Sequence, residues 1–421
     1  MKHKTSTKDL QLSSNERLFI ESGSVFKPKN YKNFKPQGNK IYTFHAGFKK
    51  KYDDLLIIIF DSLVNVECVY SKTSTPSAPI IWDKKHNNGK CKALIVNSGN
   101  ANAHTGKKGI EIIKHYSNIL SKKIKCKKNE ILISSTGIIG EIFDPKIIIN
   151  QINKLHFKDT THILDAAKAI MTTDTYPKTS VHKLLIDNEI INIYGFAKGS
   201  GMIQPNMGTM LAYIFIECKI SNLNLKKLLK KNLNSTFNSI SVDGDTSTSD
   251  TLMLFSLNKK NINLKKQKNF KILSAAIYDI MFNLSQQVIK DGEGLSKLIQ
   301  ANVFKAKSKN QANNIAFSII NSALVKTAIA GQDANWGRII MAIGKSFEKV
   351  NQNKITISFG KNIVCTKGAI YKKIDLKKIN RYIKNKIIKI NVNLGIGNCS
   401  STAYGNDLNY KYIKINADYR S

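Results

Sequence analysis

Residues 198–217 read Lys-Gly-Ser-Gly-Met-Ile-Gln-Pro-Asn-Met-Gly-Thr-Met-Leu-Ala-Tyr-Ile-Phe-Ile-Glu and divide into two parts of different character. The first part, 198–208, contains three glycines and Pro205, which is typical of an irregular loop. The second part, Met210 to Ile216, is an unbroken apolar run and predicts a strand buried on both faces. Thr209 stands at the junction, directly after a glycine.

This junction suits an N-terminal nucleophile. If the Gly208–Thr209 peptide is cut, Thr209 begins the strand, and its new α-amine can act as the general base for its own hydroxyl. Gly208 leaves room for that hydroxyl to attack the preceding carbonyl in an N-to-O acyl shift. The alternative interpretation is that Thr209 merely opens a strand after a glycine-rich turn.

The length and the net charge limit the classes of protein to which the chain can belong. A chain of 421 residues can form one large domain or two ordinary ones. Its net charge of +37 would suit a nucleic-acid surface. However, the lysines are spread through every segment, and there are only four arginines, the residues that best read phosphates and bases. We therefore expect no nucleic-acid partner, and a basic nucleic-acid-binding protein remains the alternative from a different class.

The cysteines and the apolar segments indicate the compartment. The six cysteines show no C-x-x-C pair and no metal-ligand spacing with histidine, so we expect free thiols in a reducing compartment. Met1 to Lys8 has no apolar core, so no signal peptide is expected. Apolar stretches such as Leu55 to Phe60 are far too short to span a membrane. We expect a cytoplasmic protein without a membrane partner.

Apolar runs alternate with amphipathic and small-residue segments along the chain, which indicates an α/β fold. Residues 1–40 form a weakly patterned leader, and compact structure is expected to begin near Ile41. Strands are expected at 54–60, from about 92 and 130, and at 387–394 and 410–417. Helices are expected from about 109 and at 145–156, 165–171, 223–233 and 275–289.

Several polar loops are candidate parts of a site. The loop 97–106 follows a strand and has the tight turns of a site wall, although a structural Asn/Gly turn would look the same. Ser-Ser-Thr-Gly at 134–137 can direct donors at a developing oxyanion, but this short motif is weak when taken alone.

Two further loops carry carboxylates. Glu293, between two glycines, is free to meet a substrate amine, with a solvated turn as the alternative. Three carboxylates within 241–251 suggest Ca²⁺ or Mg²⁺, but the spacing is not that of an EF-hand, so no metal is expected.

The opening stretch resembles the self-processing loop of the ornithine acetyltransferase family, the glutamate N-acetyltransferases of arginine biosynthesis. The matching positions are Lys198, Gly199, Gly201, Met202, Pro205, Thr209, Met210 and Leu211. Gly208 departs from the alanine that is usual there, and we expect this smaller residue to affect the speed of self-cleavage without blocking it. Further matches lie at 96–106, 134–137, 243–248, 324–328 and 335–338.

The resemblance implies a layered α/β sandwich of sheets and helices that is N-terminal-nucleophile-like and made as a self-cleaved precursor. After the leader 1–40, it implies an alpha chain at 41–208 and a beta chain at 209–421. Two alpha and two beta chains would assemble into a heterotetramer.

The resemblance also implies the site residues. Cleavage falls between Gly208 and Thr209, Thr209 is the nucleophile, and Thr136 and Gly137 form the oxyanion hole. The substrate-binding residues are Thr172, Lys198, Thr209, Glu293, Asn416 and Ser421, where Ser421 replaces the usual threonine.

The implied reaction moves the acetyl group from N-acetyl-L-ornithine to L-glutamate through acetyl-Thr209. No metal and no tightly bound cofactor are called for. Some family members also accept acetyl-CoA as a co-substrate, and the sequence leaves this second activity open. A self-cleaving amidase or aminopeptidase, in which water replaces glutamate, is the nearest alternative, and Asn416 and Glu293 argue against it.

Overall fold

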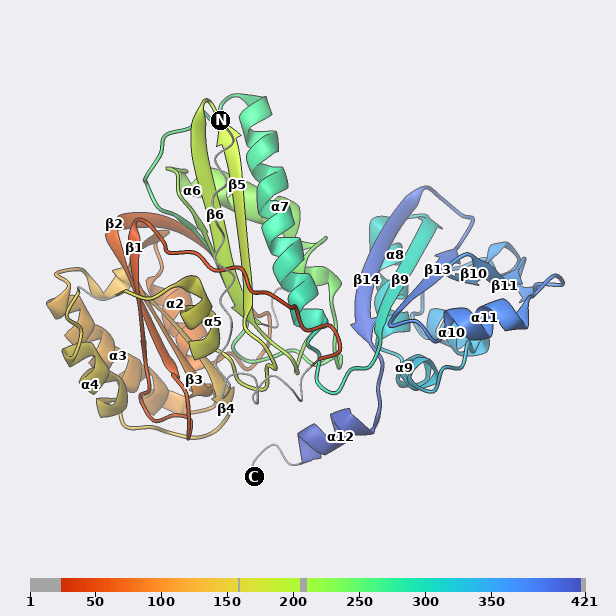
Figure 1. Cartoon of the computed structure of the whole chain (residues 1–421), viewed down its shortest axis with the longest axis horizontal. Coiled ribbons are helices and arrows are strands. Elements are labelled where there is room, and N and C mark those ends of the chain that lie inside the picture. Colours follow the sequence, from red (N-terminus) through yellow and green to blue (C-terminus); the bar gives the residue numbers. More distant parts are fainter. Residues whose placement is uncertain (1–23, 158–159, 205–209, 418–421) are drawn as a thin grey trace.

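The structure is a computed structural model that describes residues 24–157, 160–204 and 210–417. Within these ranges the chain forms two sheets (Figure 1). The first has eight strands in the order β4-β3-β2-β8-β7-β6-β5, with β1 also paired to β2. These strands are β1 (Asn39–Phe44), β2 (Leu55–Tyr70), β3 (Lys90–Asn100), β4 (Ile131–Ile138), β5 (Lys178–Ile186), β6 (Glu189–Lys198), β7 (Leu211–Ile216) and β8 (Thr251–Ser256).

The long strand β2 divides this sheet into two halves. Its first part pairs with β1 and β3, its last part pairs with β8, and the exposed residues 61–63 lie between. Leu56 and Ile58 belong to the same buried cluster as Phe215 of β7, so the two halves pack face to face. Leu55 and Ile57 point to the opposite face, as alternation along a strand requires.

Helices cover the two outer faces of these halves. The outer face of the β1–β4 half packs against α2 (Ala78–His86), α3 (Gly106–Lys123) and α4 (Lys146–Asn153). The outer face of the β5–β8 half packs against α6 (Asn222–Leu233) and α7 (Gln267–Ile289). The short helix α5 (Ile163–Ala169) contributes to the inner cluster. The layers are thus helix, sheet, sheet and helix, which confirms the predicted α/β sandwich.

The second sheet forms a separate lobe (Figure 1). Its strand order is β12-β11-β10-β13-β9-β14, and α8 (Lys309–Ile320), α9 (Ala323–Ala330), α10 (Trp336–Gly344) and α11 (Leu376–Tyr382) accompany it. The strands are β9 (Leu298–Ala306), β10 (Thr356–Phe359), β11 (Asn362–Thr366), β12 (Ala369–Ile370), β13 (Ile387–Asn393) and β14 (Cys399–Asn406).

The strand expected at 410–417 is wrong. These residues form a helix, α12 (Tyr410–Ala417), that leaves the second lobe (Figure 1). The alternating pattern is misleading because the segment packs on a loop of the first region and not beside a strand. The Asn409 side chain donates to the Gly294 carbonyl at 2.8 Å, and a Cβ at Gly294 would lie 2.4 Å from the Tyr412 nitrogen.

Ordered packing begins before Ile41. The Ser24 backbone N–H donates to Thr175 Oγ1 at 3.1 Å, and Thr179 donates its hydroxyl to the Lys32 carbonyl. The Phe34 ring lies 4.9 Å from the Tyr194 ring. These single anchors are too sparse to produce a periodic pattern in the sequence.

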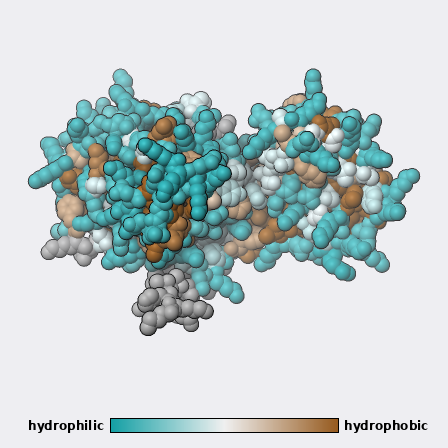
Figure 2. All heavy atoms as spheres, turned by 90° about the horizontal axis from the view of Figure 1, so that it is seen from above, coloured by the Kyte–Doolittle hydropathy of each residue, from teal (hydrophilic) through white to brown (hydrophobic). Residues whose placement is uncertain are grey.

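Hydrophilic side chains cover most of the face drawn in Figure 2, with smaller hydrophobic areas between them. Across the described ranges, no helix is both long enough and apolar enough to cross a membrane.

Candidate active site

The predicted oxyanion pair lies at an irregular strand end. Thr136 and Gly137 are near the end of β4, where the register with β3 shifts at Gly99 and Asn100. Gly137 has a φ of 129°, and a Cβ there would lie 2.3 Å from the carbonyl carbon of Gly99. Both facts require glycine at this position. The two strand ends therefore approach each other at backbone distance beside Thr136.

The second group of predicted residues comes from the end of β6. Lys198 is the last residue of that strand and pairs with Leu211 of β7. Its ammonium group donates to Thr172 Oγ1 at 3.1 Å. The structure therefore brings together two of the predicted substrate-binding residues from segments far apart in the sequence.

Burial controls the charge on Lys198. Burial lowers the pKa of its ammonium group, while the negative charges of Asp174 and Asp250 oppose that effect. The nearby positive charge of Lys178 lowers the pKa further. The protonation of Lys198 therefore depends on the neighbouring carboxylates.

Glu293 and Asn416 form the third group. Asn416 on α12 donates from Nδ2 to Glu293 Oε2 at 2.9 Å. The Glu293 backbone N–H donates to the Ser200 carbonyl at 3.0 Å. A Cβ at Gly201 would lie 2.4 Å from the Glu293 carboxylate, so glycine is needed for the carboxylate to occupy this place. This contact explains why a glycine-rich loop and a distant acidic residue occur in one site.

One cavity of about 220 Å³ connects the three groups. Its walls come from the ends of β4 and β6, the start of β7, the segment just before β8, the Glu293 loop and α12. The predicted site residues that line it are Thr136, Gly137, Thr172, Lys198, Glu293 and Asn416.

The segment 247–250 also lines this cavity, although the sequence analysis gave it no role. Asp250 is 2% exposed, and burial raises the pKa of its carboxyl well above the ordinary value, against the lowering influence of Lys198. In the sequence, Asp250 could have been noticed from its position in a run of hydroxyl and carboxylate side chains just before β8. That run resembled a metal loop, and the polarity alone could not assign it to this cavity.

The carboxylate of Asp243, in the same run, accepts backbone hydrogen bonds from Met202 at 2.6 Å and Ile203 at 2.8 Å. In the portion of the chain that the structure describes, no three His, Cys, Asp or Glu side chains gather as a metal site would need.

Gly208, Thr209 and Ser421 lie outside the described residues. Their predicted roles stay predictions. The described neighbours Met210 and Leu211 line the cavity.

A family model described as the ArgJ family matches residues 40–421, which is nearly the whole chain. The chain belongs to the ArgJ family. Curated relatives agree with this assignment over most of their lengths. The Arginine biosynthesis bifunctional protein ArgJ of Bartonella henselae is 42% identical over 390 residues, which cover 91% of this chain and 95% of the relative. The protein of the same name from Bradyrhizobium diazoefficiens is 40% identical over 393 residues, with the same coverage.

Among solved structures, that of Arginine biosynthesis bifunctional protein argJ from Bacillus halodurans is 37% identical, with a TM-score of 0.44. The match covers 49% of this chain and 97% of that chain.

Membership of the ArgJ family makes the chain an enzyme of arginine biosynthesis. It is a glutamate N-acetyltransferase, as the motifs predicted. The remaining question is how the groups around the cavity perform the transfer.

Proposed function

We propose that this ArgJ protein transfers the acetyl group of N-acetyl-L-ornithine to L-glutamate by a ping-pong mechanism through acetyl-Thr209. The observation that carries the proposal is the convergence of Thr136, Gly137, Thr172, Lys198, Glu293 and Asn416 on one cavity. These residues come from separate parts of the chain, and the resemblance to the family implies a role for each of them.

The first half-reaction would be an attack by Thr209 Oγ on the acetyl carbonyl carbon. The Thr209 α-amine takes the hydroxyl proton and delivers it to the departing ornithine nitrogen as the amide C–N bond breaks. Thr136 and Gly137 stabilise the negative oxygen of the tetrahedral intermediate, a role worth about 3–4 kcal/mol per donor in other acyl transfers.

The second half-reaction would reverse these roles. The α-amine of L-glutamate attacks the ester carbonyl carbon, the C–O bond to Thr209 breaks, and the hydroxyl recovers its proton. Both amino acids carry an α-carboxylate, so one set of charged residues can orient both of them. Lys198 supplies a cation for a carboxylate, and Glu293, held by Asn416 at 2.9 Å, supplies an anion for an amine. Thr172, Thr209 and Ser421 complete the substrate contacts.

The active enzyme would first have to be made by self-cleavage. Thr209 Oγ attacks the Gly208 carbonyl, the peptide shifts to an ester, and water hydrolyses that ester to free the Thr209 α-amine. We propose that the resulting chains assemble as two alpha and two beta subunits in the cytoplasm. The reaction needs no metal or tightly bound cofactor, and acetyl-CoA is a candidate second acetyl donor.

The test is N-acetylglutamate formation by the purified protein. Acetylornithine and L-glutamate should yield N-acetylglutamate and ornithine without acetyl-CoA. A second assay with acetyl-CoA as the sole donor determines whether the protein is bifunctional. Release of free acetate at the same rate with and without glutamate would instead identify a hydrolase and overturn the proposal.

A further inference from the structure

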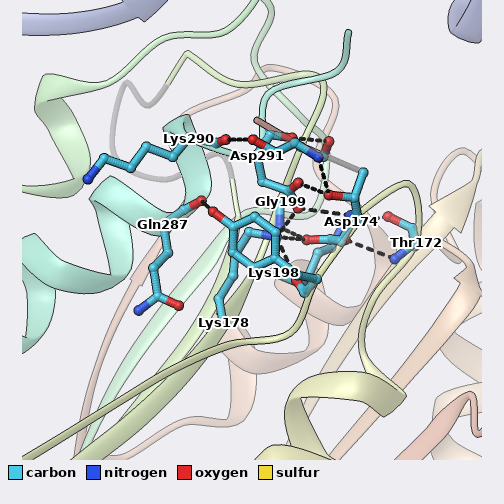
Figure 3. Close-up of polar contacts among 12 residues, drawn as sticks. Thr172, Asp174, Lys178, Lys198, Gly199, Gln287, Lys290 and Asp291 are labelled. Atoms are coloured by element: carbon cyan, nitrogen blue, oxygen red, sulfur yellow. Dashed lines mark hydrogen bonds and ion pairs between the residues drawn. The ribbon is translucent and has the colours of Figure 1, made fainter. Parts of the chain in front are cut away.

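The side chain of Lys178 is fully buried and lies among the polar contacts drawn in Figure 3. The ammonium group of Lys178 is 2.6 Å from Asp174 Oδ1 and 2.6 Å from Asp291 Oδ2. It also donates to the Tyr176 carbonyl at 3.2 Å. All three side chains of the two ion pairs are 0% exposed. Lys178 itself was not among the residues that the motifs selected.

The first carboxylate holds two segments of the site. Asp174 Oδ2 accepts the Thr172 backbone N–H at 2.9 Å, and Asp174 Oδ1 accepts the Gly199 backbone N–H at 2.7 Å. One side chain therefore fixes the backbone at Thr172 and directly after Lys198 (Figure 3).

The second carboxylate holds the Glu293 loop. Asp291 accepts the Thr175 backbone N–H at 2.9 Å. The carbonyl of Asp291 accepts the Ser200 hydroxyl at 2.6 Å, and the Ser200 carbonyl accepts the Glu293 N–H at 3.0 Å. The loop that follows β6 and the loop that carries Glu293 are thus joined on both sides of Ser200.

We infer that Lys178 is a positioning residue for acetyl transfer: through Asp174 and Asp291 it holds Thr172, Lys198 and Glu293 in one geometry. Among the charged neighbours, Asp174 raises the pKa of Lys198 most. This inference rests on the proposed function. The three segments have no common strand or helix, so the buried ion pairs supply their common anchor. A displacement of about 1 Å at a distant support can cost about 10²-fold in rate.

Burial of charge is costly, and an apolar group in the same space often stabilises a fold as well or better. The buried ion cluster therefore contributes mainly by orienting the site residues. A carboxylate can accept several backbone N–H groups at once, whereas an apolar side chain can accept none. Asp174 does this for two segments of the site.

The two carboxylates differ in their relation to Lys198. Burial alone would raise the pKa of Asp174, but Lys178 and Lys198 outweigh it and lower that pKa to about 2. Burial raises the pKa of Asp291 to about 6, against the influence of Lys178. The charged groups that act on Lys198 are Asp174, Asp250, Glu293, Lys178 and Lys49. Asp174 raises the pKa of Lys198 more than any other neighbour, whereas Asp291 contacts Lys178 and the Thr175 backbone, so Asp291 provides a comparison of equal charge.

The experiment compares Asp174→Asn with Asp291→Asn in the self-cleaved protein. Each substitution removes one buried negative charge that contacts Lys178, and asparagine retains an oxygen acceptor. Asp174→Asn should lower the pKa of Lys198 more than Asp291→Asn does, because Asp174 is the neighbour that raises that pKa most. The loss of kcat/KM on the alkaline side of the pH profile should therefore begin at lower pH in Asp174→Asn, with KM carrying the change. The alkaline side of Asp291→Asn should lie closer to that of the wild type.

Lys178→Met provides the third variant. We expect about a 10²-fold lower kcat/KM, because the anchor of three segments is lost. If this variant does not fold, the pH profiles of the two asparagine variants still test the positioning role. Equal alkaline limbs in both asparagine variants, or a fully active Lys178→Met, would overturn the positioning role. A wild type that transfers no acetyl group from acetylornithine to glutamate would overturn the proposed function instead.

Discussion

The two sheet regions differ in how they use buried charge. The eight-stranded region buries Asp174, Lys178 and Asp291 as a connected ion cluster beside the cavity. Within residues 298–406, all of which the structure describes, Lys326 is the one buried charged side chain. The first region therefore fixes its site residues internally, and the second is mainly a packed aliphatic body.

The second region still contributes to the site, but from its surface. Asn416 reaches Glu293 from α12, a helix with no buried residue. When buried ion pairs hold a site residue, its position is fixed as the protein folds. The position of a residue on an exposed helix depends instead on how that helix packs. This difference predicts a severe loss of activity for substitutions at site residues of the first region and a graded loss for substitutions in the second.

The largest effect is expected at Thr209, two residues before β7 in the sequence. Thr209→Ala has no hydroxyl for the acyl shift, so the protein should remain one chain and show no acetyl transfer. Thr209→Ser retains the hydroxyl and should cleave and keep some activity. Gel electrophoresis and N-terminal sequencing of the second chain, expected to begin Thr-Met-Leu-Ala in the wild type, measure the outcome. A fully active, uncleaved Thr209→Ala protein would exclude the N-terminal nucleophile.

A smaller but still large loss is expected for Thr136→Ala at the end of β4. Loss of one oxyanion donor should lower kcat by about 10²–10³ without changing the fold. Steady-state kinetics and circular dichroism together measure this. If kcat falls less than about threefold and the circular dichroism spectrum is unchanged, Thr136 has a structural role. The loss of a hydrogen-bond donor to the transition state would lower kcat by about 10²–10³.

A graded effect is expected at the surface helix of the second region. Asn416→Ala removes the hydrogen bond to the Glu293 carboxylate, and bonds to charged groups contribute about 1.5–3 kcal/mol, so KM should rise roughly 10- to 100-fold. Tyr410→Ala on the same helix is the matched control because Tyr410 is 88% exposed. If both variants raise KM equally, the helix and not the Asn416 amide is responsible.

The same division explains what could be read from the sequence. Strand β7 was evident because all six of its residues are buried and apolar, as the run predicted. The ion cluster was not evident, because nothing in the spacing of Asp174, Lys178 and Asp291 indicates that they meet. Helix α12 was misread because its packing partner, Gly294, lies far away in the sequence. Local sequence patterns predict individual strands such as β7, whereas contacts between residues far apart in the sequence determine the ion cluster and the packing of α12.

The last effect is expected on stability and not on activity, at Lys326, where the two regions meet. Its ammonium group donates to the Val242 carbonyl at 2.6 Å and to the Asn406 carbonyl at 2.7 Å. Burial lowers the pKa of Lys326 from 10.5 to about 8, against the raising influence of Asp243 and Asp407. Between these two values the unfolded chain holds a proton that the folded chain has released, so the stability contributed by Lys326 should rise with pH.

This contribution is complete above pH 10.5 and is lost as the pH falls through about 8. Relative to Lys326→Met, which cannot titrate, the wild type should gain up to about 3 kcal/mol across that window, at about 1.4 kcal/mol per pH unit. Urea unfolding at several pH values measures the difference, and Lys361→Met, at an exposed position, controls for loss of one positive charge. A difference between wild type and Lys326→Met that is independent of pH would mean that Lys326 keeps its proton on burial, held by the carbonyl oxygens of both regions.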